Sequence, residues 1–190
     1  MASDSADYSP APERFRDYLL FLARSCLGWK EQARLSPSDV VQQTLLEAHQ
    51  KQHQFRGHTD AEMAAWLRQM LAYRLADAQR ALGRALRDVS RECSLEAMLD
   101  DSSARMGSWL AGEQSSPSDH AVREEELLRL AGALAQLPTD QQQAVERKHL
   151  HGQTIAAIAQ EMGRTEAAVG GLLRRGMTQL RELLAHDSES

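Results

Sequence analysis

The chain has 190 residues and a formal net charge of −5, with 42% hydrophobic but only 5% aromatic residues. The negative charge argues against a protein that coats DNA through bulk electrostatics. Leu, Ala, Gln, Glu and Arg outnumber the β-branched and aromatic residues, which favours helices over strands. No apolar run reaches the length of a membrane span and the first thirty residues lack a secretion signal, so we expect a cytoplasmic, all-α protein.

In the first half, the hydrophobic pattern predicts two helices before a loop. After a polar tail, apolar residues recur every three or four positions from Phe15 to Trp29, which indicates one helical face. Ser36 supplies the start of a second helix. The other side of this second helix is polar and carries Asp39, Gln42, Gln43 and Glu47. The stretch "HQFRGHTDAEM" that follows predicts a loop.

A long helix is expected from about Ala61 to Arg91, with an apolar stripe from Leu71 to Val89. Four arginines share the roughly opposite face, at steps of four, three and four: Arg80, Arg84, Arg87 and Arg91. Acidic partners at i±4 are missing apart from Asp88, and like charges at this spacing repel each other. We therefore expect an anionic partner for this face, with a merely solvated charge stripe as the alternative.

Charge and composition divide the chain further. Segments 61–91 and 143–185 carry net charges of +3 and +2, whereas 92–126 carries −7. The Ser-, Gly- and acid-rich stretches of this middle part predict a linker. The expected organisation is a disordered tail at 1–12, a helical domain at 13–91, an acidic linker at 92–125, a second helical domain at 126–185 and a tail at 186–190.

The second domain is expected to be a four-helix helix-turn-helix domain without a wing. A helix ends at Pro138, and three more are expected at about 139–150, 154–161 and 165–184. Ala159, Gly163 and Val169 have the spacing that this motif needs. They supply a small residue where two helices touch, a glycine for a left-handed turn and an apolar residue that returns to the core.

The last of these helices is expected to contact DNA. Its N-terminal residues Arg164, Thr165 and Glu166 would face the major groove, and Arg174 and Arg175 would contact phosphates. The same helix carries Gly170, Gly171 and Gly176, and an interior glycine costs about 1 kcal/mol relative to alanine. One hypothesis is a recognition helix that is loosely held alone and tightens on DNA. The alternative is small residues at a weak-contact site.

Few residues suggest other chemistry. Cys26 lies on an apolar helix face and is interpreted as a core residue; Cys26 and Cys93 are too few for a disulfide framework and do not have metal-site spacing. His149 and His151 are expected near a helix end, not on one helical face. With no nucleophile–base pair, phosphate-binding loop or metal cluster, we expect a protein that is not an enzyme and that needs no cofactor or metal.

Both halves together resemble the sigma-70 family of RNA polymerase sigma factors, in its small extracytoplasmic-function group. The first half does so through "DVVQQTLLEA", "FRG" and "AWL", and the second through "LAQLPTDQQQAVERKHLHGQTIAAIAQEMGRTEAAVGGLLRRGMTQLREL". The resemblance implies a factor that binds core RNA polymerase and directs promoter recognition and DNA melting. Core polymerase and promoter DNA are the implied partners, and an anti-sigma factor is left open as a further one.

The resemblance also implies roles for single residues. Asp39, Gln42, Gln43 and Glu47 would bind the clamp helices of the largest polymerase subunit. Phe55 and Arg56 would capture a flipped base of the minus-ten element. Trp66, Arg80, Arg84 and Arg87 would hold its non-template strand, and the second domain would read the minus-thirty-five element as duplex. Where family members commonly have a basic residue and Ser after the valine, this chain has Gly170 and Gly171.

Two other functions are compatible with the sequence. A helix-turn-helix repressor or activator would form a stable dimer on a palindromic site. A polymerase-binding adaptor would have a degenerate DNA-binding domain, as the glycines suggest.

Overall fold

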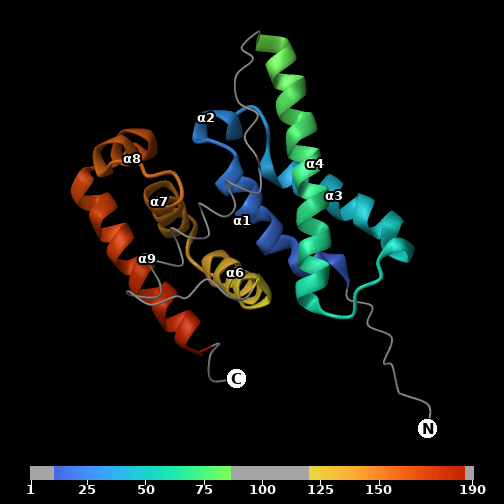
Figure 1. Ribbon diagram of the computed structural model, residues 1–190. Helices are drawn as coiled ribbons and strands as arrows, with labels where there is room; N and C mark the ends of the chain where they lie inside the picture. The colour runs from blue at the N-terminus through green and yellow to red at the C-terminus, as the bar shows by residue number, and fades with distance from the viewer. Residues whose placement is uncertain (1–10, 87–119, 187–190) are drawn as a thin grey trace.

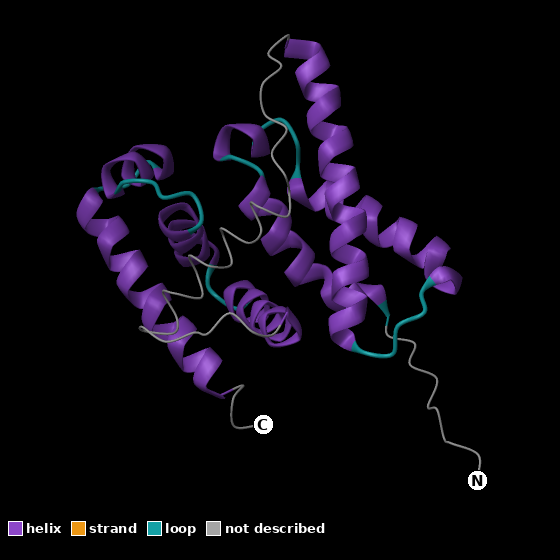
Figure 2. Ribbon diagram, in the orientation of Figure 1, coloured by secondary structure: helices purple, strands orange, loops and turns teal. Residues whose placement is uncertain are grey.

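The computed structural model describes residues 11–86 and 120–186. These residues form helices joined by loops and turns (Figure 2), which confirms the all-α class predicted from composition. Within these two ranges, no helix combines the length and apolar character that crossing a bilayer requires.

Three helices form the first half: α1 (Arg16–Cys26), α3 (Pro37–Lys51) and α4 (Asp60–Leu86). Shorter helices connect them, namely η1 (Pro12–Phe15), α2 (Trp29–Gln32) and η2 (Gln52–Gln54). The helix expected across 15–29 is interrupted after Cys26, because Leu27 is extended and Gly28 is the N-cap of a separate helix, α2. Residues 87–91, expected to continue α4, lie outside the described residues.

The core of this half lies where α1, α3 and α4 pack together. Cys26 is buried there, as predicted, whereas Cys93 lies outside the described residues. The fully buried large side chains of this half are Tyr18, Leu19, Leu22, Leu27, Met63, Leu67, Leu71 and Leu75. Those of α4 lie on one face of that helix, and α3 buries Val40, Val41, Thr44, Leu45 and Ala48 from one of its faces, which leaves the outer faces of α3 and α4 toward solvent.

The second half contains α6 (His120–Ala135), α7 (Thr139–His149), α8 (Ile155–Met162) and α9 (Glu166–His186). The sequence predicted the bounds of the last three to within two residues. Thr154 caps α8, since its hydroxyl accepts a hydrogen bond from the backbone N–H of Ala157 at 3.2 Å. The α8–α9 pair forms the expected helix-turn-helix.

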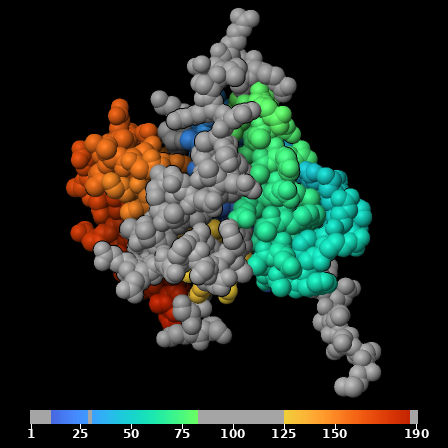
Figure 3. Space-filling view, viewed as in Figure 1, coloured from blue at the N-terminus to red at the C-terminus, as the bar shows by residue number. Residues whose placement is uncertain are grey.

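The two halves contact each other directly. α6 lies between α1 and α9 (Figure 1) and packs on α1, α4 and α9. One cluster of buried hydrophobic residues therefore runs through both halves. A polar contact adds to it, because Arg24 of α1 donates a hydrogen bond to Glu146 of α7 at 3.1 Å. α3 and α4 lie on one flank of the molecule, and α8 and α9 lie on the opposite flank (Figures 1 and 3).

Candidate nucleic-acid interface

The loop before α4 is held by the first turn of that helix. Glu62 accepts hydrogen bonds from the backbone N–H groups of His58, at 2.7 Å, and Thr59, at 3.2 Å. In return, the Thr59 hydroxyl accepts from the backbone N–H of Glu62 at 3.2 Å, which completes a reciprocal cap. These bonds, first that from His58, lower the pKa of the Glu62 carboxyl below its ordinary value. The loop therefore enters α4 in a fixed conformation.

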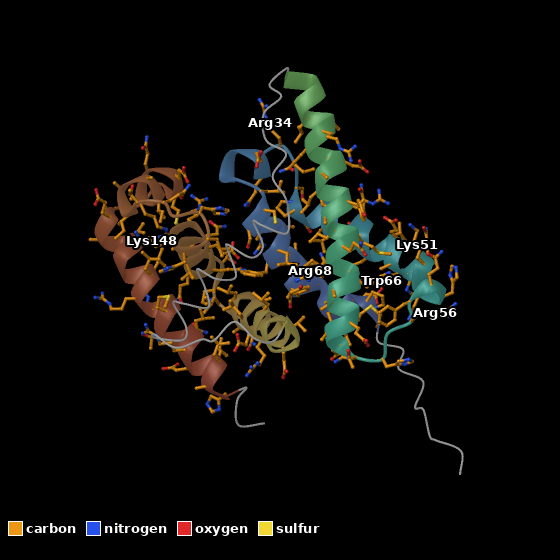
Figure 4. The ribbon with its side chains drawn as sticks, viewed as in Figure 1. Arg34, Lys51, Arg56, Trp66, Arg68 and Lys148 are labelled. Carbon is orange, nitrogen blue, oxygen red and sulfur yellow. The ribbon has the colours of Figure 1, made fainter. Side chains whose placement is uncertain are left out.

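An aromatic pair closes the other end of this loop. The Phe55 and Trp66 rings lie 5.3 Å apart between centroids in a tilted arrangement, and both side chains are half-buried. Gly57 lies under the Phe55 ring, where an added Cβ would also come within 2.8 Å of the Glu62 Cβ. Only glycine fits there. Arg56 is exposed beside this pair, near the end of α3 (Figure 4). The loop thus places an aromatic pair and a cation together.

The outer face of α3 is mostly polar, as the sequence predicted, although it also carries the exposed Leu46. Asp39, Gln42 and Gln43 are exposed. Glu47 differs, because it is half-buried and engaged within the protein: Lys51 donates to it at 2.6 Å and the Arg74 Nη2 atom lies 2.7 Å away. Lys51, followed by Arg74, holds the pKa of Glu47 below its ordinary value despite partial burial. Glu47 therefore ties α3 to α4 in the free chain.

The basic face of α4 is described in part. Arg80 is exposed and pairs with Asp77 at 2.7 Å, so it has an acidic partner at i−3, although the sequence offers none at i±4. Both side chains are more than two-thirds exposed, so this pair contributes little to stability. Arg84 lies on the described helix, whereas Arg87 and Arg91 lie outside the described residues. Arg80 is therefore available to an anion that displaces Asp77.

The helix-turn-helix has the geometry that its three diagnostic residues predict. Gly163 adopts the left-handed conformation, with φ of 62°, and ends α8. Ala159 and Val169 are buried against Ile158 in a separate small core between α8 and α9. Arg147 of α7 supports this unit with a 3.0 Å hydrogen bond to Glu161 of α8. The turn therefore presents the start of α9 at the surface.

The residues expected to contact duplex DNA lie at that surface. Arg164 pairs with Asp140 of α7, and the Thr165 hydroxyl accepts from the backbone N–H of Ala168 at 3.2 Å, which caps α9. Glu166 is exposed, and so are Arg174 and Arg175 one to two turns later. The exposed side chains between them are small, since positions 167 and 168 are alanines. This helix can thus contact phosphates but has few groups that reach base edges.

The three glycines of α9 have different surroundings. Gly176 is buried against α7, where an added Cβ would lie 3.1 Å from the Val145 Cγ2 atom and 3.3 Å from the Gln141 Cβ. Gly176 therefore allows α7 and α9 to approach closely. The glycine at this position is explained by the packing of these two helices and not by contact with DNA. A Cβ at Gly171 would meet only the head of Arg175, and one at Gly170 would meet nothing within 4 Å.

The histidine pair lies near the end of α7, as expected. His149 is its last residue, and burial, aided by Lys148, lowers its pKa. His151 lines a cleft of about 460 Å³ between α7 and the α1–α3 segment. Within the described ranges, no three His, Cys, Asp or Glu side chains are grouped as metal ligands.

Two features of this interface were not singled out in the sequence. The reciprocal cap of Thr59 and Glu62 has a sequence signature, Thr-x-x-Glu before an apolar run, that could have found it. Tyr73 of α4 is a large hydrophobic side chain that stays 65% exposed, and only the position of α4 in the fold reveals this.

Comparisons with known proteins concern mainly the second half. Residues 127–180 match the family model described as Sigma-70, region 4, and they run from the middle of α6 into α9. The co-crystal structure of the sigma factor RpoE in complex with the anti-sigma factor NepR from Bartonella quintana is similar at 20% identity and a TM-score of 0.34, with 92% of each chain covered. No curated protein matches the chain. The family match therefore concerns residues 127–180, which are similar to region 4 of sigma-70 proteins.

Proposed function

We propose that the chain is a sigma factor of the extracytoplasmic-function group, which binds core RNA polymerase and directs promoter recognition and DNA melting. The observation that carries this proposal is the match of residues 127–180 to sigma-70 region 4, on a segment that folds as a helix-turn-helix. The capped loop with Phe55, Arg56 and Trp66 supports it from the other half of the chain.

In this mechanism the two halves contact different parts of a promoter. The α8–α9 unit would hold the minus-thirty-five element as duplex, through Arg174 and Arg175 on phosphates. The α3 face with Asp39, Gln42 and Gln43 would contact the polymerase clamp. Arg56, Arg80 and the aromatic pair would hold the melted minus-ten strand, because single strands are bound by a positive groove with stacking platforms. Bond formation belongs to the polymerase, so the chain itself would be no enzyme.

Strand opening in this mechanism needs no nucleotide hydrolysis by the chain. A base that leaves the stack would be trapped by the loop that carries Phe55 and Arg56. The binding of this base would offset the cost of unstacking, which is roughly a few kcal/mol. Each half carries little positive charge, so neither is expected to bind DNA tightly alone. Docked on polymerase, the two contacts act at a high effective concentration and their free energies combine.

Substitution of the basic face tests this function. The full-length double variant Arg80→Ala with Arg84→Ala should co-elute with core polymerase like the wild type but should lose open-complex formation. A repressor would keep operator binding through α8 and α9 in the same variant, and an adaptor would be indifferent to the change. Tight, sequence-specific binding of the free wild-type chain to a palindrome would contradict the proposal.

One observation favours the adaptor as a second candidate. The exposed start of α9 offers Ala167 and Ala168, with open space at Gly170, where base-reading side chains would be expected. An adaptor of this kind would associate with polymerase without changing its choice of promoter. Transcription from a promoter with a scrambled minus-thirty-five element separates the two, because a sigma factor should lose activity on it.

A further inference from the structure

Tyr73 is exposed on α4, the helix that also carries Trp66 and Arg80, to which the proposed function gives contacts with DNA. Among the described residues, Tyr73 and Leu46 are the large hydrophobic side chains that stay mostly exposed, at 65% and 60%. Leu46 lies on α3, whereas Tyr73 lies near the middle of α4. The aromatic ring of Tyr73 offers a large flat surface that a partner can cover.

The position of Tyr73 on α4 is regular. Trp66, Tyr73 and Arg80 are spaced by seven residues, and seven residues of an α-helix fall about 20° short of two full turns. These three side chains therefore leave α4 along nearly one line, with successive Cα atoms about 10.5 Å apart. Nucleotides of one strand are about 3.4 Å apart along a stacked duplex and farther apart where the bases unstack, so each interval spans at most about three nucleotides.

The chemistry along this line changes from aromatic to cationic. Trp66 packs against Phe55 at the loop end, Tyr73 stands free of the core in the middle, and Arg80 is exposed two turns later. The pair of Arg80 with Asp77 is an exposed one that a phosphate can replace. An exposed ring between an aromatic pair and a cation is what a strand of unstacked bases requires.

We infer that Tyr73 is a stacking platform for an unpaired base of the non-template strand, on the line that joins Trp66 and Arg80. This inference rests on the proposed function and adds to it a residue that the sequence did not single out. Stacking uses the ring face and not the hydroxyl, so phenylalanine should replace Tyr73, whereas alanine should not. Every base has a flat face, so the contact should add affinity with little sequence preference.

The first test uses the full-length chain with core polymerase. The probe is a forked promoter fragment, duplex upstream and single-stranded in the non-template strand at the minus-ten element, taken from a promoter found by run-off transcription. Tyr73→Ala should weaken binding to the fork by about 5- to 150-fold, and Tyr73→Phe should bind like the wild type. Co-elution with polymerase and binding to duplex upstream DNA should not change in either variant.

Three results would overturn the role of Tyr73. In the first, Tyr73→Ala binds the forked fragment as tightly as the wild type. In the second, Tyr73→Ala and Tyr73→Phe lose affinity for the fork equally. In the third, Tyr73→Ala no longer associates with polymerase. The last would place Tyr73 in the polymerase contact. If the wild-type chain initiates at no promoter, the sigma function fails, and a second test then decides on Tyr73.

The second test needs no promoter. A single strand of about 12 nucleotides carrying 5-iodouracil, within the usual site size, is irradiated with the full-length chain at low salt. Trypsin should release the crosslink in the peptide that ends at Arg74 and contains Tyr73. Crosslinks confined to peptides with Phe55 or Trp66 would contradict a stacking role for Tyr73.

Discussion

Alanine substitution of two glycines in α9 tests the packing of the second half. At Gly176 an added Cβ would lie 3.1 Å from the Val145 Cγ2 atom and 3.3 Å from the Gln141 Cβ. Val145 is buried and β-branched, and the Gln141 Cβ is attached directly to the backbone, so neither can give way easily. At Gly170 nothing lies within 4 Å of the added atom. Gly170→Ala is thus a matched control in the same helix.

The expected magnitudes follow from two opposing effects. Replacing glycine by alanine inside a helix adds about 1 kcal/mol of stability at either position. Overpacking at Gly176 costs about 1–3 kcal/mol, whereas Gly170→Ala has no such cost. The free energy of unfolding should therefore rise by about 1 kcal/mol in Gly170→Ala and stay level or fall in Gly176→Ala. The gap of about 1–3 kcal/mol isolates the packing cost, since helix propensity cancels.

Urea denaturation of the full-length variants, followed by far-UV circular dichroism, measures this gap. Each kcal/mol should also move the midpoint of thermal unfolding by about 2–4 °C in a chain of this size. Equal stabilisation of the two variants would refute the close approach of α7 and α9 at Gly176. An unchanged dependence on urea concentration would show that the unfolded states are comparable.

Three further predictions concern other positions. Burial raises the pKa of Glu146 in spite of Arg24, so the contribution of Glu146 to stability is fully present below the unfolded pKa and is lost as the pH rises. The unfolding free energy of Glu146→Gln should therefore increase relative to that of the wild type as the pH rises above about 4.5. If urea titrations give the same difference between the two proteins at every pH, this prediction is wrong. Gly163→Ala should lower the unfolding free energy by about 1–2 kcal/mol because of its positive φ, and Gly163→Asn should lose less in the same titration. The pKa of Glu62 is lowered, so its stabilising effect should disappear as the pH falls through the folded pKa, and Glu62→Gln should reduce amide-exchange protection in the loop at neutral pH but not in acid.

Features set by local backbone requirements could be predicted from the sequence. The turn at Gly163 needs a left-handed residue, and the buried Ala159 and Val169 follow from helical spacing on either side of it. Thr154 and Thr165 cap α8 and α9, and these caps have a local signature that the sequence prediction did not use. Local sequence therefore identified the helix-turn-helix.

Features that join distant parts of the chain could not be predicted. Arg24 and Glu146 are separated by 122 positions, and neither has a local pattern that points to the other. Gly176 belongs to the same group, because the residues that leave no room for a side chain there belong to α7 and not to α9. The engagement of Glu47 by Arg74 is also tertiary, and it places a residue expected to face polymerase in a contact between α3 and α4.

Run-off transcription with purified core polymerase tests the central claim most directly. Genomic fragments are transcribed with and without the full-length chain, and the starts of the transcripts are mapped. We expect initiation at discrete sites only when the chain is present, and loss of these transcripts with Arg80→Ala plus Arg84→Ala. Transcripts that are identical with and without the chain, together with no co-elution with polymerase, would contradict the account.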